Sequence, residues 1–201
     1  MIQSLSGDSI ISDNSVLSPD EETALDATFQ QLAHRHGYIP NLMQTLALAP
    51  HGLAAFVALS NYTCYGSYLT ERQRQLATII GLRDVQYGWI HQEPLALAAG
   101  VTPEQLVLIH DGRVPKDLPP AERALCGYAL EITAGRQLPQ RVAEDVQSNF
   151  SSRQIVDIAL LTAYSMALSA LATGLEVPIE PPETLEFERA WQQQRIATET
   201  G

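Results

Sequence analysis

Three copies of one helix-start pattern constrain the fold of this chain more than any other feature of its sequence. In each copy a Ser or Thr is followed three residues later by Glu or Gln, so that the two side chains satisfy free backbone N–H groups at a helix start. The copies begin at Ser18, Thr70 and Thr102. In two of them a Pro occupies the first helical position, where its missing N–H costs nothing.

Further helices are predicted from three signals: prolines at helix starts, glycines at helix ends, and apolar residues at helical spacing between them. No segment alternates apolar and polar residues with a period of two between hairpin turns, so the sequence predicts no sheet. We therefore expect an all-α fold, a compact helical bundle. The expected helices cover 18–36, 39–48, 50–66, 70 to about 80, 86–99, 102–111, 119–134, 139–149, 152–173 and 185–196.

The length of the chain and the positions of its helix-breaking residues predict one domain with two extensions. The chain has 201 residues, and one domain holds roughly 150. We expect a single domain over 18–178. The Ser-rich segment 1–17 is expected to be a loose arm, and 179–201 a proline-containing linker followed by a C-terminal helix.

The charge balance argues against several classes of partner. Twelve Lys and Arg face 23 Asp and Glu, a net charge of −11. Nucleic acids and anionic lipids both need a basic surface, so we expect neither as a partner. The apolar stretch from Ile158 to Leu175 is interrupted by Ser and Thr, and we interpret it as a buried core helix rather than a membrane span.

The cysteines and the N-terminal sequence bear on compartment and redox chemistry. Cys64 and Cys126 lie far apart, and no CxxC pair occurs. The sequence therefore predicts neither a dithiol redox centre nor a structural zinc site. The first fifteen residues have no basic and apolar signal-peptide pattern. We expect a cytoplasmic protein.

Four segments, taken in order from Ile39 to Pro178, resemble the carboxymuconolactone decarboxylase-like family, which includes the alkyl hydroperoxidase D proteins. They are IPNLMQTLALAP, LTERQRQLATIIGLRDVQYGWIHQEPLALAAGV, LIHDGRVPKDLPPAERAL and IVDIALLTAYSMALSALATGLEVPIE. The resemblance implies a helical bundle that assembles as a homo-oligomer, a trimer or hexamer. It implies no metal and no organic cofactor. It places the active site at the second segment, near a subunit boundary.

The resemblance also implies two chemistries, and this chain departs from both. One branch reduces peroxides through a CxxC pair, whose positions here hold Val85 and Gly88. The other branch decarboxylates a lactone acid. Its usual His aligns with Gln92, and its usual Glu with Gln75. Amides do not exchange protons in the ordinary pH range.

The residues that remain could still support decarboxylation. That reaction needs a held carboxylate, donors for the developing enolate oxygen and an acid that protonates carbon. We expect His91 to be the acid or base, with Tyr87 one helical turn away to orient it. Gln92 and Gln75 would donate hydrogen bonds to the oxygen. The candidates for binding the substrate are Trp89, Arg72 and Arg83. The more common roles of such residues are packing for Trp89 and surface ion pairing for the arginines.

Three functional hypotheses follow. The first is a cofactor-free lyase or isomerase that acts on a small organic acid, lactone or related carbonyl compound. The second is a non-catalytic oligomeric binding protein, suggested by the amides at Gln75 and Gln92. The third, a thiol peroxidase, would need Cys64 or Cys126, which lie outside the family's active-site segment.

Overall fold

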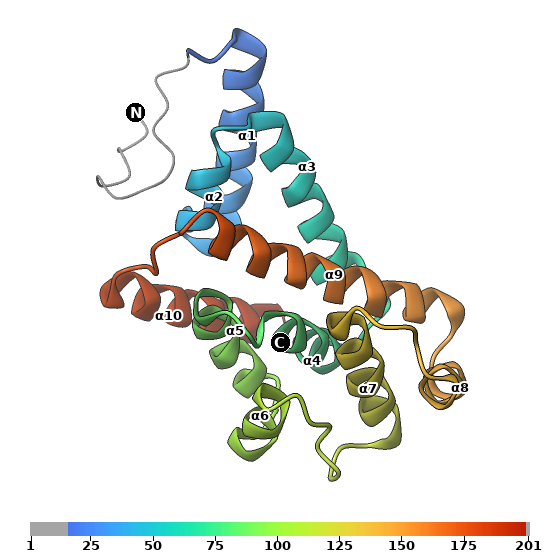
Figure 1. Cartoon of the computed structure of the whole chain (residues 1–201). Coiled ribbons are helices and arrows are strands. Elements are labelled where there is room, and N and C mark those ends of the chain that lie inside the picture. The colour runs from blue at the N-terminus through green and yellow to red at the C-terminus, as the bar shows by residue number, and fades with distance from the viewer. Residues whose placement is uncertain (1–15, 200–201) are drawn as a thin grey trace. The chain divides into compact units, whose positions relative to one another are not determined.

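The computed structural model describes residues 16–199, and these form helices joined by loops, with no strand among them (Figure 1). The predicted all-α fold is therefore confirmed for this part of the chain. Most of the predicted loose arm, residues 1–15, lies outside the described residues. The helices are α1 (Pro19–His36), α2 (Asn41–Leu46), α3 (Pro50–Asn61), the π-helical turn η1 (Tyr62–Gly66), α4 (Glu71–Leu82), α5 (Gln86–Ala98), α6 (Pro103–His110), α7 (Pro120–Ala134), α8 (Gln140–Asn149), α9 (Ser152–Gly174) and α10 (Pro182–Glu199).

All three predicted helix starts have the expected geometry. Ser18, Thr70 and Thr102 each accept a hydrogen bond from the backbone three residues later, and the partner side chain accepts one from the cap residue in return. The end of α1 is likewise determined by a neighbouring residue. Gly37 has φ of 77°, a left-handed conformation that favours glycine and stops the helix.

Two helices differ from the sequence prediction. The helix expected over 50–66 ends at Asn61 and continues as η1. The Tyr62 hydroxyl in this turn donates to Oδ1 of Asp157 over 2.7 Å, and the backbone N–H of Tyr68 donates to Oδ2 over 2.8 Å. These contacts with a buried carboxylate 95 residues away explain why local spacing did not reveal the turn. The last helix, α10, begins earlier than expected, at Pro182.

Contacts divide the described chain into two compact units, with boundaries inside α3 and α9. Unit 1 comprises residues 16–59 and 171–199, and unit 2 comprises residues 60–170. In unit 1 the indole N–H of Trp191 on α10 donates to the carbonyl oxygen of Arg35 on α1 over 3.1 Å. The single domain predicted over 18–178 crosses this division and stays a prediction.

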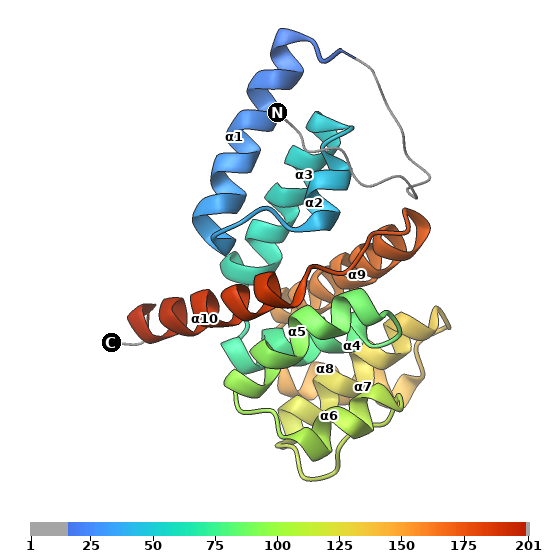
Figure 2. The ribbon, with the colours of Figure 1, turned by 90° about the vertical axis from the view of Figure 1, so that its left-hand side faces the viewer.

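Helix α4 is the centre of unit 2, in contact with α5, α6 and α7 (Figure 2). Its residues 76–82 are buried without interruption, and Leu76, Ile79 and Ile80 have no exposed surface. A helix that is apolar on all sides is stable only when other helices surround it. Packing against α4 therefore fixes the positions of the surrounding helices and of the side chains that they carry.

Gly81 allows α4 to approach α9 closely. A Cβ atom at this position would lie 2.5 Å from Cβ of Ser165 and 2.9 Å from the carbonyl oxygen of Thr162. The Ser169 hydroxyl donates to the carbonyl oxygen of Gly81 over 3.2 Å. Because one of the close atoms is backbone, α9 itself would have to move to admit a side chain.

We expect Gly81→Ala to lower the free energy of unfolding by about 2 kcal/mol through overpacking. Gly127 on α7 is the matched control, since no atom lies within 4 Å of where its Cβ would be. Gly127→Ala should raise the free energy of unfolding by about 0.5–1 kcal/mol, the helix preference of Ala over Gly. Urea unfolding measures both; a shift of the same sign in the two variants would contradict the close-packing argument.

Helix α9 is long and apolar enough to cross a membrane by length and composition, and 39% of its most apolar window is buried. Core helices of soluble proteins have the same properties. Ile158 and Leu161 are fully buried, and Asp157 accepts a hydrogen bond from the Tyr62 hydroxyl of η1. The interpretation of α9 as a core helix stays a prediction.

Candidate active site on α4 and α5

The packing of α5 fixes which of its side chains face α4. Gly88, Gln92 and Ala96, spaced four residues apart, are the buried positions of the helix. A Cβ atom at Gly88 would lie 2.7 Å from Cδ2 of Leu82. This close approach holds α5 in one rotation, with Gln92 directed at α4 and His91 on the adjoining, half-buried face.

Gln92 and Gln75 meet between the two helices. The Gln92 side-chain nitrogen donates a hydrogen bond to the side-chain oxygen of Gln75. The Gln75 nitrogen donates to Oε1 of Glu71 over 2.7 Å. Arg74 donates to the other oxygen of the same carboxylate over 2.6 Å. Glu71 thus orients Gln75, and Gln75 orients Gln92, while each amide nitrogen keeps a second N–H for a ligand.

The structure also brings Tyr87 and His91 together. Their ring centroids are 4.8 Å apart, and the ring planes are inclined at 49°. This contact is the one predicted from their spacing of one helical turn. Both rings are half-buried. An imidazole in contact with a neighbouring ring, on the same helix turn as Gln92, can serve as a proton donor or acceptor.

Trp89 lies away from these groups. Its ring makes an edge contact with the ring of His110 on α6, with centroids 4.9 Å apart. This contact fits a packing role for Trp89. A role of Trp89 in substrate binding stays a prediction.

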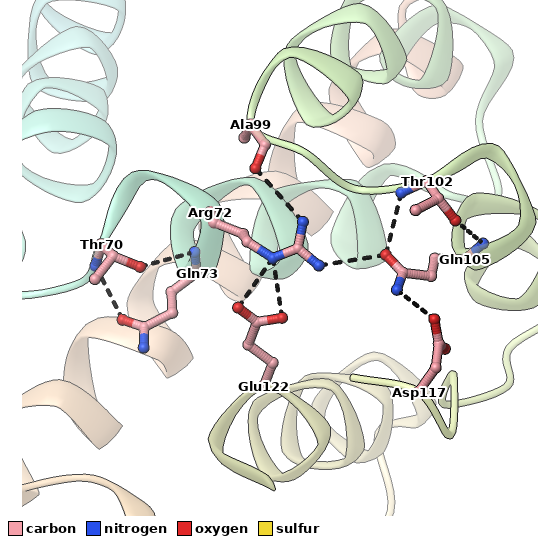
Figure 3. A network of polar contacts seen from close by, with 8 residues as sticks. All are labelled: Thr70, Arg72, Gln73, Ala99, Thr102, Gln105, Asp117 and Glu122. Carbon is pink, nitrogen blue, oxygen red and sulfur yellow. Dashed lines mark hydrogen bonds and ion pairs between the residues drawn. The ribbon is translucent and has the colours of Figure 1, made fainter. Parts of the chain in front are cut away.

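Arg72 is already paired with a carboxylate (Figure 3). Its Nε lies 3.0 Å from both oxygens of Glu122 on α7, and its Nη2 donates to the side-chain oxygen of Gln105 over 3.3 Å. Gln105 is buried and in turn donates to Asp117 over 2.7 Å. Substrate binding by Arg72 stays a prediction, but the guanidinium has a structural partner at its Nε.

Arg83 follows the last residue of α4 and faces α7. Its Nη1 donates to the hydroxyl of Thr133 over 2.7 Å, and its Nη2 lies 3.3 Å from a carboxylate oxygen of Asp84. It lines a cavity formed with α7 and α8, to which no residue of α5 contributes. The structure thus places Arg83 in a setting different from that of the α5 candidates.

The two thiols are not placed at the start of α5. Burial raises the pKa of Cys126 to about 12, so this thiol stays protonated near neutral pH. Cys64 belongs to η1, where its sulfur lies 3.8 Å from the hydroxyl of Thr63. The position of the family's second cysteine is occupied by Gly88, and Leu82 fills the space where a side chain would lie.

Sequence reasoning named the histidine and the two amides, whose roles stay predictions, and it missed two carboxylates. Glu71 and Glu122 were ordinary acidic residues in the sequence, and only their contacts with Gln75 and Arg72 give them a role. Glu71 had one available signal, its position four residues before Gln75 on the same helix face. Within residues 16–199, no group of three or more His, Cys, Asp or Glu side chains is arranged to hold a metal ion.

Comparison with solved structures identifies the fold. The chain matches the alkylhydroperoxidase AhpD core of an uncharacterized peroxidase-related protein from Ralstonia eutropha JMP134, with TM-score 0.69, 19% identity and coverage of 87% of this chain and 95% of that one. An uncharacterized peroxidase-related protein from Silicibacter sp. TM1040 matches with TM-score 0.68, 21% identity and coverage of 83% and 88%. A cysteine-to-alanine variant of the debrominase Bmp8, in complex with 2,3,4-tribromopyrrole, matches with TM-score 0.69, 17% identity and coverage of 93% and 99%.

No family model and no curated protein sequence matches the chain. The structural likenesses establish that the chain has the all-α alkylhydroperoxidase D-like fold, as the sequence resemblance implied. At identities of 17% to 21%, these likenesses show the fold and not the activity.

Proposed function

We propose that this alkylhydroperoxidase D-like chain is a cofactor-free enzyme, a lyase or isomerase, that uses His91 as its acid or base. The supporting observation is the contact of the His91 and Tyr87 rings, at 4.8 Å, on the helix that also presents Gln92 to Gln75. A proton carrier and oriented amide donors thus share one short stretch of α5. The proposed substrate is a small organic acid, lactone or related carbonyl compound.

In a decarboxylation, each of these residues would have a separate role. The bond between the substrate carbon and its carboxylate breaks, carbon dioxide leaves, and the electron pair moves into a neighbouring carbonyl to form an enolate. The second N–H groups of Gln92 and Gln75 stabilise the enolate oxygen. Protonated His91 then delivers its proton to the carbon and regains one from solvent. Tyr87 positions the imidazole, and no co-reactant is consumed.

The experiment is turnover of 4-carboxymuconolactone by the purified wild-type protein. Substrate loss and carbon dioxide release are followed together and compared with the spontaneous reaction. We expect both to proceed at the same rate and faster than without protein. Unchanged substrate would contradict decarboxylation of this compound, and the same assay on other lactones and carbonyl acids then tests the wider proposal.

A non-catalytic binding protein is the second candidate, because Gln92 and Gln75 are bonded to each other where the related family transfers protons. It predicts a ligand that is bound and recovered chemically unchanged, and an altered ligand would reject it. A thiol peroxidase has less support, given the protonated thiol of Cys126. A peroxide-consumption rate that is unchanged when both cysteines are replaced would reject that function.

Assembly as a homo-oligomer, a trimer or hexamer, is part of the proposal. Val156 and Leu160, one turn apart on α9, are 56% and 37% exposed. Apolar side chains on one helix face favour contact with another copy. Light scattering that gave the mass of one chain, 22.0 kDa, would contradict it. A cytoplasmic location and the lack of nucleic-acid or membrane partners stay expectations from the charge and sequence pattern.

A further inference from the structure

Unit 2 contains a cavity that is separate from the His91 candidates. Its volume is about 580 Å³, within the range of small-molecule sites. It lies among α7, α8, the loop after α6 and the Arg83 end of α4, and no residue of α5 lines it. The proposed roles of the α5 residues therefore do not include this cavity.

The cavity is basic although the chain is acidic. Four arginines line it, against two carboxylates, Glu131 and Asp145. The arginines are Arg83, Arg123, Arg136 and Arg141. One third of the chain's twelve basic residues thus gather around one cavity in a molecule with a net charge of −11. Such local concentration of one sign of charge attracts ligands of the opposite sign.

The four guanidiniums differ in how firmly they are held. Arg83 is 15% exposed, forms a 3.3 Å ion pair with the exposed Asp84, and donates to Thr133 and to a backbone carbonyl oxygen of α4. Arg123 is anchored by the carbonyl oxygen of Leu118 over 2.7 Å. Arg136 lies 3.9 Å from Glu131, a loose ion pair on a side chain that is 75% exposed.

Arg141 has no hydrogen bond or ion pair with the described residues. Each guanidinium has five N–H donors, so donors remain at all four for an oxyanion. Two anchored arginines, Arg83 and Arg123, together with the exposed and unpaired Arg141 suit a ligand that completes the charge pairing.

Part of the lining is apolar. Val114, Leu130 and Val142 belong to it, with Pro120, Ala124 and Ala134. Gly127 leaves open space, because no atom lies within 4 Å of where its Cβ would be. A ligand that fills this cavity therefore needs an apolar body as well as an anionic group.

We propose that this cavity binds a small organic anion, a carboxylate or phosphate ester with an apolar body, at a site distinct from the one on α5. The arginines bind the oxyanion through paired N–H groups, and the aliphatic side chains and the space beside Gly127 accommodate the body. Arg83, predicted from the sequence to hold substrate near His91, is assigned to this second site.

The test is calorimetric titration of the whole protein with four defined compounds. Phenyl phosphate and 3-phenylpropionate combine an anion with an apolar body, inorganic phosphate has the charge alone, and benzyl alcohol has the body alone. We expect saturable binding of at least one of the two combined compounds, about tenfold tighter than phosphate, with benzyl alcohol not bound. The proposal would be overturned if neither combined compound bound more tightly than inorganic phosphate, or if benzyl alcohol bound as tightly as the combined compounds.

Three variants locate the binding. Arg141→Gln removes the unpaired charge on an exposed side chain and should weaken binding about tenfold. Gly127→Leu fills the open space without changing charge and should abolish binding; circular dichroism checks that it folds. Arg113→Gln is the control, because Arg113 does not line the cavity, and it should bind like the wild type. Wild-type affinity in Arg141→Gln would overturn the assignment even if Gly127→Leu failed to fold.

Discussion

His91→Ala is expected to lower kcat by about 10²–10⁴-fold on the substrate that the wild-type protein turns over, the usual contribution of a positioned acid or base. The variant keeps the Gln92 to Gln75 hydrogen bond, because Gln92 faces α4 independently of position 91. Substrate binding should therefore survive, with KM changing far less than kcat. Steady-state kinetics of the two proteins measures both constants.

Two matched variants separate catalysis from structure. His110→Ala removes a different histidine ring, which contacts Trp89 rather than Tyr87, and should leave kcat close to the wild-type value. Tyr87→Phe keeps the ring beside His91 and should retain most of the activity, whereas Tyr87→Ala should lose more. Wild-type kcat in His91→Ala would show that another group moves the proton.

Arg72→Ala is expected to lower the free energy of unfolding by about 3 kcal/mol, within the range for breaking an ion pair that is largely removed from water. The side chains of Arg72 and Glu122 are 26% and 12% exposed. Without Arg72, the Glu122 carboxylate stays in this setting without its cation, and Gln105 loses one of its donors (Figure 3). Urea unfolding measures the change.

The control for this prediction is Arg113→Ala. Arg113 and Asp111 are 67% and 54% exposed and lie 4.0 Å apart, so their ion pair should contribute less than about 0.5 kcal/mol. The double variant Arg72→Met with Glu122→Met should recover part of the lost stability, since no uncompensated carboxylate remains. A loss in Arg72→Ala no larger than that in Arg113→Ala would mean that solvent screens the pair.

Much of the candidate site could be predicted, because its contacts are local or follow the family pattern. Tyr87 and His91 are one turn apart on one helix, so their contact follows from helix geometry alone. The resemblance assigned Gln75 and Gln92 to the family's two proton-handling positions, and the packing of α4 against α5 joins them by a hydrogen bond. Helix spacing could not show whether Gln92 or His91 faces α4, since neighbouring positions differ by about 100°. The packing of Gly88 against Leu82 decides that rotation.

The sequence by itself determined where most of the helices begin and end, because capping residues, prolines and glycines act within a few residues of the backbone groups they satisfy. Only the tertiary structure decided which charged groups meet. Arg72 pairs with a carboxylate 50 residues away, and the π-helical turn bonds to Asp157 at a distance of 95 residues. The basic cavity likewise joins Arg83 to α7 and α8. These partners are chosen by the packing of whole helices around α4, a sum of many buried contacts that no local pattern in the sequence encodes.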